Sequence, residues 1–206
     1  MIENWNYFCT PVYGVIWEDY LQTASEVANE YLKITKEHTE INPIYPMYQT
    51  GNINEDSRLA PLVSDILKQS YVILDEQGYD LTNYKLFFSE FWVQEHYKLS
   101  GQERHVHGLN NVLTGFYFLK CPENCCKVVF HEPRVSKEFG NYLPEKNESQ
   151  VTLSSQAVNF IPEPGKLIIT NSWLPHTFTR NESDESLIMI HFNIAAIFEP
   201  STPTII

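Results

Sequence analysis

The sequence predicts an α+β fold that is mainly β, with two N-terminal helices ahead of a sandwich or barrel of short strands. Over the first third of the chain, apolar residues recur every three or four positions, as on one face of an amphipathic helix. From residue 84 onward, short β-branched and aromatic runs alternate with turn residues. Phenylalanine and tyrosine number 12 each, which suits the walls of a β-barrel.

We expect the 206 residues to form a single domain, 1–206. Within it, residues 1–82 would form a helical buttress, residues 83–197 the β core and residues 198–206 a tail. The first helix is expected over about 16–36, and the second from Ser57, as the N-cap, to about residue 75. Residues 38–56 contain Asn-Pro, Tyr-Pro and Gly-Asn pairs and are expected to form a surface connection between the helices.

Seven strands are expected after the helices. They are 84–93, the stretch that carries His105 and His107, 114–120, 127–130, 156–161, 166–170 and 186–192. Residues 132–155 are polar, contain proline and glycine, and are expected to be a long loop that acts as a lid.

Composition excludes several classes of partner and of site. Acidic residues outnumber basic ones 26 to 14, so the chain is poorly suited to broad binding of nucleic-acid phosphates. No apolar run is long enough to span a bilayer, and the first residues lack the features of a signal peptide. Adjacent Cys125 and Cys126 then favour reduced thiols and a cytoplasmic location, and the CPENCC segment is expected to form a turn rather than half of a zinc site.

Three histidines form the main candidate site. His105 and His107 are two residues apart, and a strand directs side chains i and i+2 to the same face. His176 lies far downstream, after Ser172-Trp173-Leu174-Pro175. A single histidine is most often a surface residue, but an H-x-H pair with a distal histidine is typical of a metal site in a double-stranded β-helix (jelly roll). We therefore predict that His105, His107 and His176 bind a metal and form the catalytic centre.

Other short motifs accompany the histidines and can be compared with known families. They are Tyr48-Gln49-Thr50, Phe91-Trp92, Gly101, Thr114-Gly115-Phe116-Tyr117-Phe118-Leu119, Phe130-His131-Glu132-Pro133-Arg134, Pro162-Glu163-Pro164-Gly165-Lys166-Leu167 and Phe192-Asn193. With the histidine motifs, they resemble Fe(II)/2-oxoglutarate-dependent oxygenases related to prolyl hydroxylases, over about residues 45–195. The resemblance implies a double-stranded β-helix and a hydroxylase-type dioxygenase. It also implies Fe(II) on His105, His107 and His176, with 2-oxoglutarate as a small-molecule co-substrate beside a primary substrate that it does not identify.

Two positions depart from the pattern that the resemblance implies. Where the family carries an arginine for the distal carboxylate of 2-oxoglutarate, this chain has Leu187, and where it often carries a tyrosine, Phe118. Arg134 follows a strand in a matching Pro-Arg pair, so we predict that it binds the co-substrate; a structural ion pair in the loop is the competing interpretation. His191 shares a strand face with Leu187 and is interpreted as a core histidine.

Two alternatives to the oxygenase stay open at this stage. One is a cupin-like metalloprotein of another activity, although cupins usually have a glutamate about four residues after the second histidine, and this chain has Asn110-Asn111-Val112 there. The other is a metal-binding module that no longer uses 2-oxoglutarate, which the loss of the arginine motivates. Three histidines also suit Zn or Mn, and the pattern indicates no oligomeric state.

Overall fold

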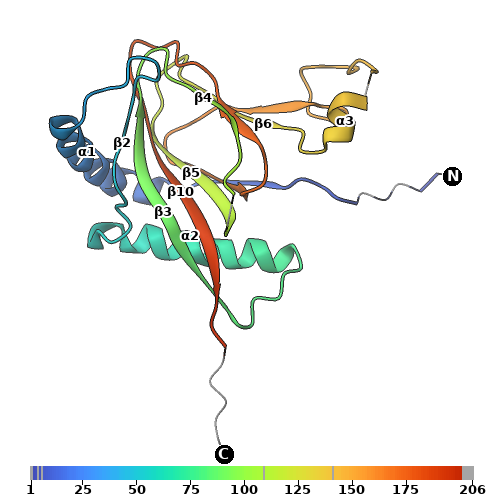
Figure 1. Cartoon of the computed structure of the whole chain (residues 1–206), viewed down its shortest axis with the longest axis horizontal. Helices are drawn as coiled ribbons and strands as arrows, with labels where there is room; N and C mark the ends of the chain where they lie inside the picture. The colour runs from blue at the N-terminus through green and yellow to red at the C-terminus, as the bar shows by residue number, and fades with distance from the viewer. Residues whose placement is uncertain (1, 4, 6, 109, 141, 201–206) are drawn as a thin grey trace, which may run out of the picture.

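The computed structural model describes residues 2–3, 5, 7–108, 110–140 and 142–200, so part of the predicted tail, 201–206, lies outside the described residues. Two antiparallel sheets lie against each other, and helices α1 (Leu21–His38) and α2 (Ala60–Glu76) cover the outer side of the larger sheet (Figure 1). This arrangement confirms the predicted mainly β, α+β fold. In the part of the chain that the structure describes, no helix is both long and apolar enough to cross a membrane.

The larger sheet has the strand order β1-β8-β5-β10-β3-β2 and the smaller one β4-β9-β6-β7. The strands of the larger sheet are β1 (Val12–Ile16), β2 (Met47–Gln49), β3 (Tyr84–His96), β5 (Asn111–Lys120), β8 (Lys166–Asn171) and β10 (Leu187–Phe198). Those of the smaller sheet are β4 (Gln102–His105), β6 (Val128–His131), β7 (Ala157–Phe160) and β9 (His176–Phe178).

Alternating side chains on the larger sheet divide the interior into two cores. On β10, Ile190 and Phe192 face the helices and pack in a cluster with Val27 and Leu62. The residues that alternate with them, Met189 and His191, face the smaller sheet, where Met189 joins a second cluster with Phe116, Phe118, Phe130 and Phe178. The helices therefore buttress one face of the sheet, and the other face is left to form the interior in which the histidines lie.

Several element boundaries differ from the predictions. The first helix begins at Leu21 rather than near residue 16, because Val12–Ile16 pairs with β8 as a strand. Asp56, not Ser57, caps the second helical segment, through a hydrogen bond that its carboxylate accepts from the backbone N–H of Arg58.

The predicted connection and lid also contain regular structure. The connection 38–56 includes β2, and the predicted lid 132–155 includes the short helix α3 (Val135–Gly140), with residue 141 outside the described residues. Both elements are short and were missed because their stability comes from tertiary pairing and contacts rather than from local pattern. The role of 132–155 as a lid stays a prediction, as does the division of the chain at residue 82.

Gly115 on β5 provides a test of how tightly the helix-side core is packed. A Cβ at Gly115 would lie within 2.7 Å of the carbonyl oxygen of Ile168 and would also collide with the ring of Phe192. Gly115→Ala is expected to lower the free energy of unfolding by about 1–3 kcal/mol, since backbone on a neighbouring strand cannot give way cheaply. Urea unfolding measures the change. Gly14→Ala is the control, because the nearest atom to its Cβ is 3.8 Å away; an equal loss of stability in both variants would contradict the prediction.

Candidate metal centre

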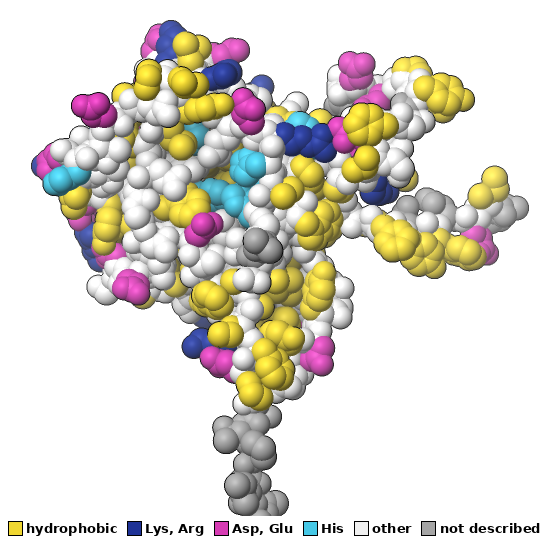
Figure 2. All heavy atoms as spheres, viewed as in Figure 1, with side chains coloured by type: hydrophobic (Ala, Val, Ile, Leu, Met, Phe, Trp, Pro, Cys, Tyr) yellow, Lys and Arg dark blue, Asp and Glu magenta, His cyan; other side chains and the backbone are white. Residues whose placement is uncertain are grey.

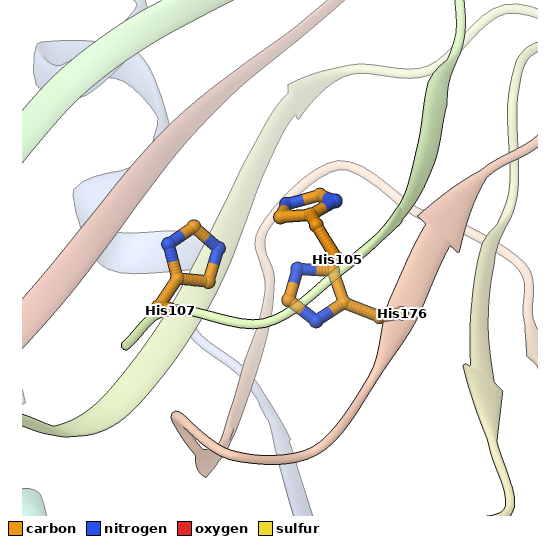
Figure 3. A group of neighbouring side chains, drawn as sticks. All are labelled: His105, His107 and His176. Carbon is orange, nitrogen blue, oxygen red and sulfur yellow. The ribbon is translucent and has the colours of Figure 1, made fainter. Parts of the chain in front are cut away.

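The structure brings His105, His107 and His176 together from two separate parts of the chain. His105 is the last residue of β4 and pairs in register with His176, the first residue of β9. One ring nitrogen from each of the three histidines lies within 4.8 Å of the other two (Figure 3). Within the described ranges, this is the only group of three or more histidine, cysteine or acidic side chains close enough to share a metal ion.

His107 is positioned in this group by a loop and not, as predicted, by the strand that carries His105. The strand ends at His105, so the argument that i and i+2 share a strand face is wrong for His107. Its backbone N–H instead donates to the carbonyl of Ser172 at 2.9 Å, and the N–H of Ser172 donates to the carbonyl of Val112 at 3.1 Å. The loop that precedes His176 therefore also positions His107.

Backbone carbonyls orient two of the three imidazoles. The Nδ1–H of His105 donates to the carbonyl of Glu103 at 2.7 Å, and that of His176 donates to the carbonyl of Leu174 at 3.0 Å. Each bond leaves Nε2 of the ring as a bare lone pair, which is the form that binds a metal. The Nε2 atoms of His107 and His176 are buried and have no hydrogen-bond partner among the described residues. A divalent cation bound at these ring nitrogens would give each of them a partner, so the donor set fits Fe(II) and equally other divalent metals with a preference for imidazole.

Burial keeps the imidazoles of His107 and His176 neutral. Burial, with a smaller contribution from neighbouring histidines, lowers the pKa of His176 to about 3 and that of His107 to about 4. Neutral imidazole is the metal-binding form, and at neutral pH neither His107 nor His176 carries a second proton that a cation would have to displace.

A fourth histidine forms part of the wall of the site. His191 on β10 is 1% exposed, and its ring centroid lies 4.7 Å from that of His107. Its Nε2 is 3.2 Å from the hydroxyl oxygen of Thr114, which can accept the ring N–H because its own proton is directed to the carbonyl of Phe192 at 3.3 Å. Figure 2 shows histidine side chains gathered in a hollow of one face of the molecule. The sequence alone led to the interpretation of His191 as a core histidine and did not predict that it contacts the site. It did place His191 on the correct face of the strand, the face that it shares with Leu187.

Asn193 and Glu90 are further polar neighbours that sequence reasoning did not assign to the site. The amide nitrogen of Asn193 lies 3.0 Å from Nδ1 of His107 and also donates to the carboxylate of Glu90. The available signal was the Phe192-Asn193 motif, together with the alternation that puts Asn193 on the same face of β10 as His191.

Among the described residues, the interior beside the histidines contains no lysine or arginine that could pair with the distal carboxylate of 2-oxoglutarate. All 14 lysines and arginines are described, and none of them is buried. The positions that depart from the family pattern, Leu187 and Phe118, are both fully buried in the apolar cluster with Met189. The residues present therefore fit a metal ion, whereas the interior does not supply a charge to pair with the distal carboxylate of 2-oxoglutarate.

Arg134 is not part of the histidine group. It follows β6, is half-exposed, and forms two contacts with Glu132, Nε to Oε1 at 2.6 Å and Nη2 to Oε2 at 2.8 Å. Lys137 contacts the same carboxylate at 2.6 Å. The Arg134 guanidinium, together with Lys137, lowers the pKa of Glu132 to about 2. The ion pair considered as the competing interpretation is therefore present.

The CPENCC segment forms a turn, as expected. The backbone N–H of Cys125 donates to the carbonyl of Pro122 at 3.2 Å, and Asn124 has a positive φ of 59°. Cys121, Cys125 and Cys126 are free thiols, and burial raises the pKa of Cys126 to about 12. Protonated thiols of this kind are poor metal ligands.

Comparisons with known proteins agree with this geometry. The sequence matches the family described as "Putative 2OG-Fe(II) oxygenase" over residues 90–193, which is half of the chain and includes all three histidines. No curated protein matches the sequence.

Solved structures of low sequence identity share the fold. A Pseudomonas putida prolyl-4-hydroxylase is 11% identical with a TM-score of 0.59, and the alignment covers 90% of this chain and 92% of the other. The non-haem α-ketoglutarate-dependent carbocyclase SnoK of nogalamycin biosynthesis is 14% identical with a TM-score of 0.65, covering 94% and 84%. A viral collagen prolyl hydroxylase from Paramecium bursaria Chlorella virus-1, solved with 2-oxoglutarate, is 12% identical with a TM-score of 0.58, covering 90% and 96%. These likenesses confirm the predicted jelly-roll core.

The buried histidines predict how stability depends on pH in the metal-free protein. Burial lowers the pKa of His96 to about 4, close to the value for His107, whereas a histidine in the unfolded chain titrates near 6.5. Between those values the unfolded chain binds more protons than the folded protein, so acidification favours unfolding. Urea unfolding in the presence of a chelator should show stability falling as the pH is lowered from 7 to 5. Stability that is constant or higher at pH 5 would contradict this expectation.

Proposed function

Because this chain belongs to the 2OG-Fe(II) oxygenase family, whose members use Fe(II) and 2-oxoglutarate, we propose that His105, His107 and His176 hold the iron of a hydroxylase-type dioxygenase. The observation that carries this assignment is the convergence of three imidazoles in which two buried Nε2 atoms have no partner. Membership of the family makes the chain an oxidoreductase and favours this function over a cupin-like protein of another activity.

The side chains around the site have distinct tasks in this proposal. The carbonyls of Glu103 and Leu174 hold the Nδ1–H groups of His105 and His176, so that Nε2 of each ring is available to the metal. His105, His107 and His176 would hold the iron, which when bound would supply the activation of dioxygen. Phe116 packs against His176 at a centroid distance of 5.4 Å and against His191 at 4.9 Å, which excludes water from the inner side of the histidine group.

For the co-substrate, we propose that Arg134 pairs with the distal carboxylate of 2-oxoglutarate. Arginine binds carboxylates through two parallel hydrogen bonds, and Arg134 belongs to a motif that matches the family. The half-exposed guanidinium would have to exchange Glu132 for the co-substrate, with Lys137 remaining on Glu132.

A second candidate function is a metal-binding protein that does not use 2-oxoglutarate. The absence of a buried lysine or arginine from the described residues is the observation that favours it. We also propose a cytoplasmic location, supported by the free thiols of Cys121, Cys125 and Cys126, and a small molecule rather than bulk nucleic acid as partner, supported by the net charge of −12.

The metal centre is tested by removing its ligands one at a time. His105→Ala, His107→Ala and His176→Ala should each lower the affinity for Fe(II) by more than about a hundredfold, since even partners outside the ligand set are worth about 10–100-fold. Metal analysis after anaerobic reconstitution measures the loading. His38→Ala is the control, because this exposed ring bonds only the carbonyl of Ile34 in its own helix. Equal loading of the wild type and His176→Ala would refute the site.

The buried His96 is a poorer control because its ring stacks on Phe178, so its removal would disturb packing.

The co-substrate anchor is tested by calorimetry with Mn(II) as an oxygen-inert substitute for iron. If Arg134 is the anchor, Arg134→Ala should lower 2-oxoglutarate affinity more than tenfold, since truncating a paired charge costs about 2–5 kcal/mol. Lys137→Ala is the matched control, because it removes the other cation from Glu132. Tight binding that survives Arg134→Ala would exclude the anchor. If the wild type binds no 2-oxoglutarate but Leu187→Arg does, the second candidate function is favoured.

A further inference from the structure

The third histidine of the group differs from the other two in the partner of its Nδ1 atom. His105 and His176 each have a backbone carbonyl there, which can only accept. His107 has the side-chain amide of Asn193, with Nδ2 at 3.0 Å. The same Nδ2 also donates to Oε2 of Glu90, which lies directly opposite Asn193 in the pairing of β3 with β10.

The direction of these bonds determines which nitrogen of His107 carries its proton. An amide nitrogen donates and has no lone pair to accept with, so Nδ1 of His107 must be the acceptor. A neutral imidazole has one N–H, which is then on Nε2. Nε2 is the buried atom with no partner, and a metal requires it to be bare.

The opposite orientation of the Asn193 amide would reverse both relations. Its Oδ1 would accept the Nδ1–H of His107 and leave Nε2 bare, but the same Oδ1 would then face the carboxylate of Glu90, acceptor against acceptor. In the observed orientation, Oδ1 of this fully buried side chain has no hydrogen-bond partner in the part of the chain that the structure describes. One amide therefore cannot both donate to the Glu90 carboxylate and accept the Nδ1–H of a metal-competent His107.

We propose that Glu90 is a positioning residue: through Asn193 it holds His107 in the tautomer that opposes metal binding, and so makes His107 the weak member of the histidine group. The inference rests on the proposed metal centre. It predicts that the carboxylate of Glu90, which is linked to His107 through Asn193, weakens cation binding. Simple electrostatics predicts the opposite, because a negative charge attracts a nearby cation.

The test is Glu90→Gln in the full chain. Glutamine has almost the same shape, and its amide can donate to Oδ1 of Asn193, so the Asn193 amide can turn and accept the Nδ1–H of His107. In the metal-free protein, two-bond ¹H–¹⁵N spectra of labelled histidine report the tautomer of each ring. We expect the Nε2–H form for His107 in the wild type and the Nδ1–H form in Glu90→Gln. Titration with Co(II) alone, followed by its visible absorption, should show binding tighter by about tenfold in the variant, the scale typical of partners outside the ligand set.

Glu95→Gln is the matched control. It removes a carboxylate from the same strand, but Glu95 bonds Ser186 and Lys36 rather than Asn193, so neither the tautomer of His107 nor the affinity for Co(II) should change. An unchanged tautomer in Glu90→Gln, or Co(II) binding that is equal to or weaker than that of the wild type, overturns the inference and leaves the metal centre intact. Co(II) binding to neither protein overturns the metal centre and the inference together.

Discussion

The alternation of side chains along β10 is the constraint on which the rest of the structure depends. β10 lies between β3 and β5 at the middle of the larger sheet. Its successive side chains therefore point in turn to two different environments, one on each side of the sheet. Ile190 and Phe192 meet the helices, whereas His191 and Asn193 meet the histidine group. A shift of one residue in register would exchange these two sets and remove both the helix-side core and the wall of the site.

The histidine group is costly to bury unless something satisfies its lone pairs. His176 is fully buried, its pKa is lowered to about 3 by burial, and its Nε2 has no partner. Unsatisfied buried polar atoms are rare in folded proteins, and they are most readily understood where a ligand completes them. Family membership and the chemistry of the three imidazoles agree on a divalent metal as that ligand.

The charge pattern of the site is unusual for a family that uses a dicarboxylate co-substrate. Cationic side chains lie at the surface, among them Arg134 on Glu132, while the apolar side chains of Leu187, Met189 and Phe118 fill the inner end of the interior. The side chains that bond His191 and His107, namely Thr114 and Asn193, are instead uncharged, and Asn193 in turn bonds the acidic Glu90. The side chains that bond the histidines are therefore different from the cationic side chains, none of which is buried in the described residues.

The sequence by itself determined the architecture and the three histidines of the candidate metal centre. Period-3.6 and period-2 patterns are local properties, so the helices and the longer strands could be predicted, and the H-x-H and Ser-Trp-Leu-Pro-His motifs identified the three histidines. Only the tertiary structure decided how His107 enters the site, because its position depends on a hydrogen bond to Ser172, 65 residues along the chain by their numbering. The same holds for β2 and β9, which are too short to have a pattern of their own, and for the amide of Asn193 between Glu90 and His107. Hydrogen-bond direction and register between distant strands are set when the strands pair, and neither is encoded in any one segment.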